Sequence, residues 1–366
     1  MLSRTADGLF WMARYVERAE TMARLVDTAR RMVSLSHADP ERGGDLWAAI
    51  LAASGCAPHF YQNHETADRE SVCAYLLLDR ENPSSVVSCF EYARANARSL
   101  RTAVTREMWE AVNDAWIESR VLAASKLDNG AMQPVLDWVI QRGALFRGAA
   151  DASMLHDDGF DFLRLGLALE RTDSTARLLD VKSASTHPAL GGEPLDDTAD
   201  WVAILRSGGV QLGYHRMYRA DYDVRRIVDF MVLNPCCPRA LANSADMIHT
   251  HLGRLGRLYG VRGYSHHKSA ETVARLADLR IDDVLRAGLG QFLSDTIIGN
   301  NILAATIASD YHFAPAPLDL RIEEEEAKAA VEQAAEISSV PALAAMAQSQ
   351  SQAIGTGKSS GLIDAA

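Results

Sequence analysis

One eleven-residue stretch occurs twice in this chain, and the repetition limits the folds that the sequence can adopt. The segment ERAETMARLVD (17–27) aligns with ERTDSTARLLD (170–180), 153 residues further on, and six of the eleven positions are identical. Apolar residues recur in both copies at the spacing of a helix. Such self-similarity indicates that one structural unit is present twice.

Two further matches keep the same order along the chain. WAAIL (47–51) corresponds to WVAIL (201–205), and YLLLDRENP (75–83) corresponds to FMVLNPCCP (230–238), at spacings of 154 and 155 residues. Because three matches follow one another with almost constant spacing, chance similarity is a poor explanation.

The matches predict two copies of one helical unit, residues 1–155 and residues 156–312. Helical periodicity extends through nearly all of both copies. We therefore predict an all-α fold, an internally duplicated helical bundle whose two pseudo-equivalent halves pack together. Residues 313–366 are rich in Ala, Glu, Gln, Ser and Gly and cannot bury enough apolar surface for a core, so this tail is predicted to be of low complexity and mostly disordered.

The totals exclude several classes of protein. The 366 residues carry a net charge of −11, which argues against a nucleic-acid binder because phosphate contacts need clustered Lys and Arg. The five cysteines are odd in number and lack zinc-ligand spacing, which indicates reduced thiols in a cytoplasmic protein. No segment approaches the roughly 20 uncharged residues of a membrane span, so no membrane association is expected.

The repeated segments combine charged residues with apolar surroundings. An isolated helix of this kind would be a solvated stripe with i,i+4 ion pairs. The second copy is apolar nearly all round, which is typical of a buried helix, and buried charges must be paired or must face a cavity. A structural ion-pair lattice and a functional cavity both satisfy this requirement. The candidate site residues are Arg14, Glu17, Arg18, Arg24, Glu170, Arg171, Ser174 and Arg177.

Other candidate motifs are weaker. The segment YHRMYRADYDVRR (214–226) interleaves Tyr with Arg and could bind an anion, or it could form an exposed helix edge. Histidines occur in HTH (249–251) and SHHK (265–268), but the chain lacks the Glu-x-x-His pairs of helical di-metal sites, so no metal is expected. The standard glycine-rich phosphate loops are also absent from the sequence, and no cofactor is expected.

Three quoted segments carry a family resemblance. SRTADGLFWMARYVERAETMARLVD, FDFLRLGLALERTDSTARLLDVK and FMVLNPCCPRALANS resemble segments of the bacterial alpha-E family, an all-helical domain named for its Glu-Arg motif. The resemblance extends from the N-terminus to about residue 312. It implies a gene neighbourhood with a circularly permuted ATP-grasp protein, sometimes fused to the helical domain, and often with a transglutaminase-like peptidase. That context implies a pathway that forms or breaks amide bonds on peptides.

Three functions are compatible with these observations. The protein could be a helical partner of the ATP-grasp ligase that binds the ligase, its peptide substrate or both near the Glu/Arg site. It could be an enzyme that uses Glu17 and Glu170 as acid/base groups and the arginines as a clamp for a carboxylate or phosphate. It could also be a scaffold without a site. An open polar pocket would favour the enzyme, closed paired charges the scaffold, and a large exposed apolar patch the partner.

Overall fold

The computed structural model describes residues 1–35, 40–123, 132–185, 198–219 and 221–313. They lie within one compact unit, Met1–Ala316. The described residues form helices and turns and include no strand, so the all-α prediction is confirmed. Apart from Phe313, the predicted tail lies outside the described residues.

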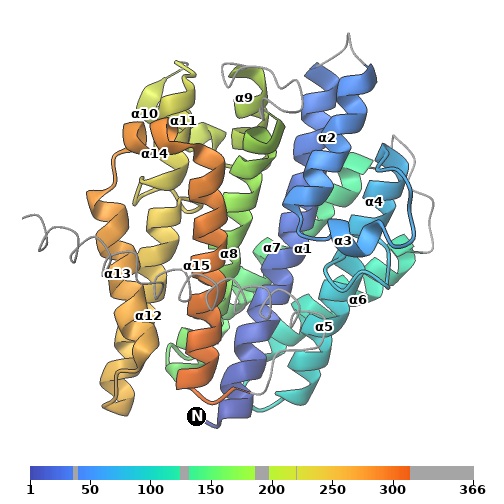
Figure 1. The fold of residues 1–366 in the computed structure, drawn as a ribbon. Helices are drawn as coiled ribbons and strands as arrows, with labels where there is room; N and C mark the ends of the chain where they lie inside the picture. Colours follow the sequence, from blue (N-terminus) through green and yellow to red (C-terminus); the bar gives the residue numbers. More distant parts are fainter. Residues whose placement is uncertain (36–39, 124–131, 186–197, 220, 314–366) are drawn as a thin grey trace, which may run out of the picture. The chain divides into compact units, whose positions relative to one another are not determined.

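The helices follow one another along the chain in a simple order (Figure 1). They are α1 (Ser3–Leu35), α2 (Pro40–Ala53), α3 (Ala57–Phe60), α4 (Arg69–Leu77), α5 (Val86–Ser99), α6 (Arg106–Ala123), α7 (Met132–Ser153), α8 (Asp158–Ser185), α9 (Thr198–Ser207), α10 (Gln211–Tyr218), α11 (Val224–Val232), α12 (Leu241–Tyr259), α13 (Tyr264–Asp278), α14 (Ile281–Ala287) and α15 (Leu289–Asp310).

Local sequence explains where several helices begin. The Asp68 carboxylate accepts the N–H of Ser71 at 2.9 Å, and the Ser71 hydroxyl accepts the N–H of Asp68, which forms a capping box at the start of α4. Ser85 caps α5 and Asp223 caps α11 through their side-chain oxygens. Each cap satisfies an N–H group that has no acceptor within its own helix.

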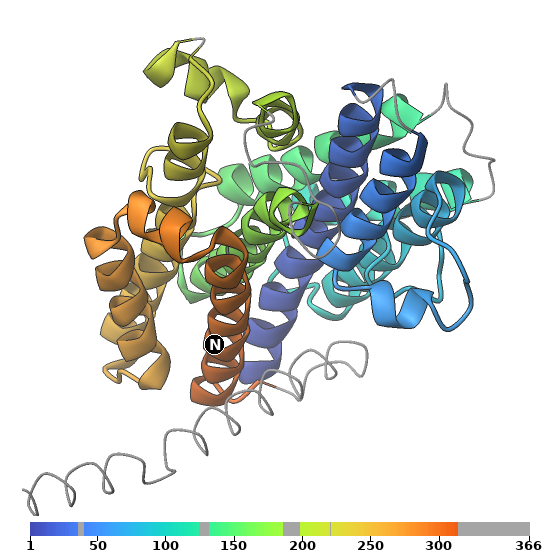
Figure 2. The same cartoon turned by 45° about the horizontal axis from the view of Figure 1, so that its top comes forward.

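The two helices that carry the repeated Glu-Arg pair, α1 and α8, lie side by side at the centre (Figure 2). They run in the same direction, because the amine of Met1 bonds Asp158 at 2.8 Å at one end while Glu17 and Arg171 meet further along. The charged residues of both helices are thereby brought to one shared interface.

A glycine allows the close approach of these two helices. A Cβ atom at Gly166 in α8 would lie 2.2 Å from the carbonyl oxygen of Phe10 in α1. Only a residue without a side chain fits at this contact.

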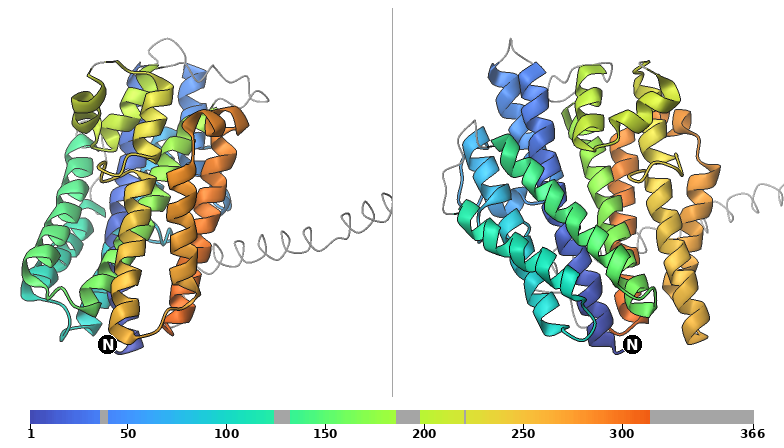
Figure 3. Two further views of the ribbon diagram at one scale, coloured as in Figure 1. Left: turned by 90° about the vertical axis from the view of Figure 1, so that its left-hand side faces the viewer. Right: turned by 180° about the vertical axis from the view of Figure 1, so that it is seen from behind.

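The remaining helices enclose the central pair. Helices α2, α4, α5 and α7 pack on α1, and α12 and α15 pack on α8; seen from behind, α7 crosses α1 obliquely (Figure 3). Trp47 and Trp201, which the repeat aligns, are both buried. The largest fully buried apolar side chains include Phe10, Phe60, Phe90, Phe146, Phe162, Trp201 and Tyr214. The charges of α1 and α8 are therefore interior, as their apolar surroundings predict.

Two pairs of helices at matching places in the predicted copies have equal lengths. Helices α4 and α11 each have 9 residues, and α7 and α15 each have 22. The division into residues 1–155 and 156–312 stays a prediction, which superposition of the two halves would test.

Candidate functional site

One charged cluster closes around Glu170 in α8. The Glu170 carboxylate accepts a bond from Nε of Arg14 at 2.9 Å and another from Nε of Arg18 at 2.6 Å. The Arg14 guanidinium also lies 4.4 Å from the ring centroid of Trp11. All three charged residues are buried. Burial alone would raise the pKa of Glu170, but the two arginines outweigh it and the pKa is lowered, so the carboxylate stays ionised.

A second cluster is built around Glu17 and Glu20, which are one turn apart on α1. Arg171 of α8 donates two bonds of 3.1 Å to Glu17. Arg147 of α7 donates through Nη1 to both carboxylates, at 3.1 Å to Glu17 and 2.5 Å to Glu20. Arg239, in the turn before α12, donates through Nη2 to Glu20 at 2.5 Å, and its Nη1 lies 3.3 Å from Glu17.

Arg24 completes the second cluster. Its Nη2 donates to Glu20 at 2.6 Å, and its Nη1 donates to the carbonyl of Ser207 at the end of α9. Four arginines from three helices and one turn therefore surround two buried carboxylates.

The charges of this cluster shift one another's ionisation. Burial would raise the pKa of Glu17, but Arg171 and the other arginines reverse the shift and hold the pKa well below its usual range. Burial and the neighbouring Glu17 raise the pKa of Glu20, and the arginines again reverse the shift. Burial lowers the pKa of Arg239 to about 10, with a further contribution from Arg24, although the two carboxylates oppose it. The pKa of Arg239 is therefore lowered even though the residue lies beside both carboxylates.

A cavity of about 530 Å³ opens beside the second cluster. This volume is within the range of small-molecule sites. None of the described residues that line it is acidic. Five are arginines: Arg24, Arg147, Arg171, Arg216 and Arg239. The others are Gly208, Gly209, Val210, Gly213, Met217, Phe230, Asn234, Cys236, Cys237 and Pro238.

The cavity has an excess of positive charge. Among the described residues, the carboxylates paired with these five arginines are those of Glu17 and Glu20, which leaves three formal positive charges. The Nη1 atom of Arg239 is buried and makes no hydrogen bond in the described part of the chain, although it lies 3.3 Å from the Glu17 carboxylate. The residue as a whole is 6% exposed. A buried cationic donor without an acceptor is costly. An anion that entered this cavity would offset the excess positive charge of the five arginines and would supply a hydrogen-bond acceptor for this Nη1.

Most of the sequence-predicted site residues meet in these two clusters. Arg177 is an exception, because it bonds Asp173 at 2.5 Å and the carbonyl of Ala53 at 3.0 Å. Ser174 is fully buried, its Oγ has no hydrogen-bond partner among the described residues, and it does not line the cavity. The predicted residues brought together are Arg14, Arg18 and Glu170 in one cluster, and Glu17, Arg24 and Arg171 in the other.

Sequence reasoning missed several contributors. Arg147 meets Glu17 only through tertiary packing of α7, and no motif surrounds it. Arg239 directly follows Pro238 in a segment that the repeat aligns, where the first copy has Ser84, so this departure from the repeat was an available signal. Arg216 lies in the Tyr/Arg segment for which anion binding was one interpretation.

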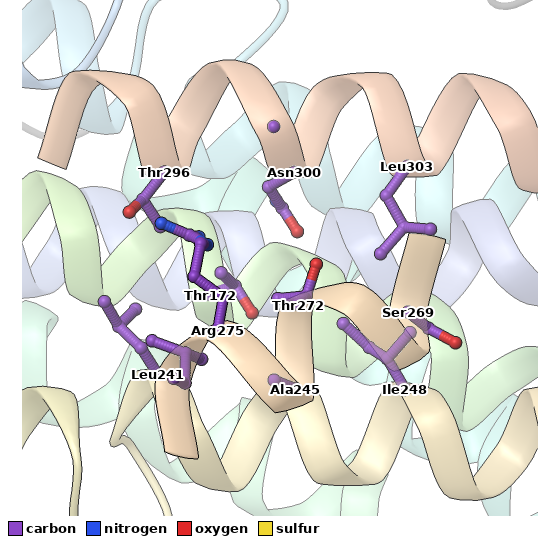
Figure 4. A pocket seen from close by; sticks show the side chains of 12 residues that line it. Thr172, Leu241, Ala245, Ile248, Ser269, Thr272, Arg275, Thr296, Asn300 and Leu303 are labelled. Atoms are coloured by element: carbon purple, nitrogen blue, oxygen red, sulfur yellow. The ribbon is translucent and has the colours of Figure 1, made fainter. Parts of the chain in front are cut away.

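A smaller cavity of about 50 Å³ lies between α8, α12, α13 and α15. Figure 4 shows Thr172, Thr272, Thr296 and Asn300 around it, opposite apolar side chains of α12. The three threonine hydroxyls donate to carbonyls of their own helices, and the Asn300 amide donates to the carbonyl of Leu169. The space is large enough for a few waters and lacks a cluster of charges.

Other kinds of site are not found within the described ranges. They contain no group of three or more His, Cys, Asp or Glu side chains able to hold a metal ion. The described cysteines form no disulfide bond with one another; Cys236 is exposed and the other four are buried. None of the described helices is sufficiently long and apolar to cross a membrane.

An all-helical domain with two buried Glu-Arg pairs is the class of protein that this fold and site define. Residues 1–312 match Alpha-E, described as a predicted alpha-helical domain with a conserved ER motif, and the chain belongs to this family. Similar curated proteins include uncharacterized proteins of Mycobacterium bovis and Mycobacterium tuberculosis, each 27% identical over 269 residues, with 68% of this chain and 29% of the relative covered. The chain thus spans less than a third of the length of these relatives. No solved structure matches it significantly.

Proposed function

We propose that this protein is the anion-binding helical component of an ATP-grasp-linked pathway that forms amide bonds on peptides. It acts in the cytoplasm beside a circularly permuted ATP-grasp protein and a transglutaminase-like peptidase. The arginine-lined cavity next to Glu17 and Glu20 receives an anionic group of the substrate. The pathway assignment rests on the alpha-E resemblance, and the binding role rests on the cavity.

The unbalanced charge of the cavity is the observation that carries the binding role. A pathway that builds amides on peptides handles carboxylates and their activated derivatives, which are anionic or strongly polar. Guanidinium groups present planar pairs of donors that suit carboxylate and phosphate oxygens. Because Glu17 and Glu20 already orient four of the arginines, the cavity offers an anion a set of donors that needs little rearrangement.

The ionisation of the glutamates supports a positioning role over an acid/base role. A general base works best with a pKa near the working pH, whereas the pKa values of Glu17 and Glu170 are both lowered by arginines. Both carboxylates are also buried beneath their arginine partners. In the Glu170 cluster the closed geometry favours a structural ion-pair role, which is the scaffold interpretation restricted to one part of the molecule.

Co-purification with the ATP-grasp protein encoded nearby tests the pathway assignment. We expect the full chain to form a complex with it and to raise its ATP turnover on a peptide substrate. Arg216→Glu should reduce this stimulation, because it places a negative charge at the rim of the cavity. Arg98→Glu is the matched control, since Arg98 is an exposed arginine of α5 outside the cavity. Absence of both complex and stimulation would overturn the assignment.

A further inference from the structure

The loop between α9 and α10 forms a cavity wall that takes no part in the Glu/Arg clusters. Gly208, Gly209 and Val210 all line the cavity. Gly209 has a φ of +71°, which favours glycine, and it reverses the chain after α9. A Cβ atom on Gly209 would lie 3.4 Å from Nη1 of Arg24. The glycine therefore lets the loop backbone lie directly against a guanidinium of the cavity.

This loop leads into the N-terminus of α10. Val210 is the N-cap residue and provides no side-chain cap. The first hydrogen bond of the helix runs from the N–H of Tyr214 to the carbonyl of Val210 at 3.0 Å. The N–H groups of the first three helical residues therefore have no acceptor within the helix. Gly213, the third helical residue, also lines the cavity. The N–H groups of Gly208, Gly209 and Val210 already donate to carbonyls of α9, so this wall contributes the partial positive charge of a helix N-terminus, which favours anions.

A second, independent observation concerns Arg239. Its buried Nη1 makes no hydrogen bond to the described residues, although it lies 3.3 Å from the Glu17 carboxylate, and the residue lines the same cavity. The cavity therefore has guanidinium donors on several walls, contributed by α1, α7, α8, α10 and the turn before α12. A planar carboxylate can be satisfied by a single guanidinium fork. Donors on several walls suit a tetrahedral group, whose oxygens point in different directions.

We infer that the anion bound in this cavity is the phosphoryl group of an organic phosphate. The inference rests on the proposed function and specifies its substrate class. A phosphate monoester carries about 1.5–2 negative charges at neutral pH and three acceptor oxygens, which fits the three-charge excess better than a singly charged carboxylate does. Val210, Met217 and Phe230 give the cavity an apolar wall for the organic part of the ligand.

Isothermal titration of the full chain with three probes tests this assignment. Phenyl phosphate and benzoate share an aromatic ring and differ in the anionic group, while inorganic phosphate lacks the ring. At pH 7.5 we expect phenyl phosphate to bind at least about tenfold more tightly than benzoate, because dianionic oxygens form stronger bonds to arginine. At pH 5.5 its affinity should fall about fourfold, since the second phosphate pKa is near 6 and most of the dianion is then protonated.

Two variants connect the binding to the cavity. Arg216→Gln removes an exposed rim charge without touching the buried network and should weaken phenyl phosphate binding about three- to tenfold. Arg98→Gln, an exposed substitution in α5, should leave it unchanged.

The outcomes separate this inference from the proposed function. Benzoate binding as tightly as phenyl phosphate would overturn the phosphoryl assignment and leave an anion-binding protein. Failure of all three probes to bind would overturn both. Equal affinity for inorganic and phenyl phosphate would retain phosphoryl recognition but overturn the organic part of the assignment, with free phosphate as the ligand. Phenyl phosphate binding that Arg216→Gln does not weaken would place the ligand elsewhere and overturn the assignment.

Discussion

The same Glu-Arg pair has two different surroundings in this protein. In one, Arg18 bonds Glu170, and the carboxylate is enclosed with two arginines. In the other, Arg171 bonds Glu17 in the reciprocal way, but four arginines gather around Glu17 and Glu20 beside a cavity. The comparison indicates that the motif itself builds the helix interface. The additional charges around one copy create the site.

Contacts further along the two helices repeat this reciprocity. Arg24 donates to the carbonyl of Ser207, and Arg177 donates to the carbonyl of Ala53. The two acceptors, Ser207 and Ala53, are 154 residues apart in the sequence. Gly209 and Gly55, also 154 residues apart, have φ values of +71° and +77° beside these guanidinium groups. These pairs support the two-copy prediction. Superposition of residues 1–155 on 156–312 should place Glu17 on Glu170, and halves that do not superpose would contradict it.

The largest expected effect on stability comes from breaking the closed cluster of Glu170, Arg14 and Arg18. Glu170→Gln leaves Arg14 and Arg18 buried without their carboxylate, which should lower the free energy of unfolding by about 3–5 kcal/mol in urea denaturation. Arg18→Met in the same chain should restore part of the loss, because one uncompensated charge is removed. A loss under about 1 kcal/mol is the value for a surface ion pair and would contradict a closed cluster.

Acid should reduce the contribution of both clusters to the free energy of unfolding, and Glu170→Gln should make that free energy less dependent on pH. The pKa values of Glu17, Glu20 and Glu170 are all lowered in the folded protein, so the unfolded chain binds more protons in acid. Their contribution to stability is present above the ordinary value of 4.5 and is lost as the pH falls below it. Between about pH 5 and pH 3 the free energy of unfolding should fall less steeply in Glu170→Gln than in the parent protein. Equal slopes would show that Glu170 titrates normally in the folded state.

Crowding the open cluster, which surrounds Glu17 and Glu20 beside the cavity, is expected to lower the free energy of unfolding by a smaller amount. A Cβ atom at Gly143 of α7 would lie 2.5 Å from Oε2 of Glu20, whose carboxylate three arginines hold in place. Gly143→Ala should therefore lower the free energy of unfolding by about 1–3 kcal/mol. Gly148→Ala in the same helix is the control, since nothing lies within 4 Å of its Cβ position. Equal melting temperatures for the two variants would show that Glu20 can move.

The repeat allowed the interior helices to be predicted, but the open cluster could not be derived from sequence. Periodicity and apolar surroundings placed Glu17 and Glu170 inside, since a helix that is apolar nearly all round has to be buried. The partners of these residues depend on tertiary packing between segments more than a hundred residues apart. Arg147 is 130 residues from Glu17 in the sequence, and Arg239 is 219 residues from Glu20, yet both pairs are hydrogen-bonded. No local sequence pattern predicts how close these arginines lie to the glutamates or from which side they approach.

Removing Arg239 should separate binding from stability. Arg239→Gln leaves Glu20 with Arg24 and Arg147, and it removes a cation whose pKa is lowered by burial and by Arg24. The free energy of unfolding should change by no more than about 1 kcal/mol, while phenyl phosphate binding is lost. A loss of about 3–5 kcal/mol would instead match removal of one partner from a closed buried pair, so the two clusters would be equivalent.

The smallest expected effect is a gain in stability at Gly299, which the predicted repeat would pair with Gly143. Gly299 of α15 lies 156 residues after it, in the other helix of 22 residues, and nothing lies within 4 Å of its Cβ position. Alanine restricts the unfolded chain more than glycine does, so Gly299→Ala should raise the free energy of unfolding by about 0.5–1 kcal/mol. Thermal denaturation beside Gly143→Ala measures both changes. Opposite signs are expected because a carboxylate fills the space beside Gly143, whereas the space beside Gly299 is open. Equal signs would mean that the two copies are packed alike at this position, and that the open cluster does not depend on a glycine in α7.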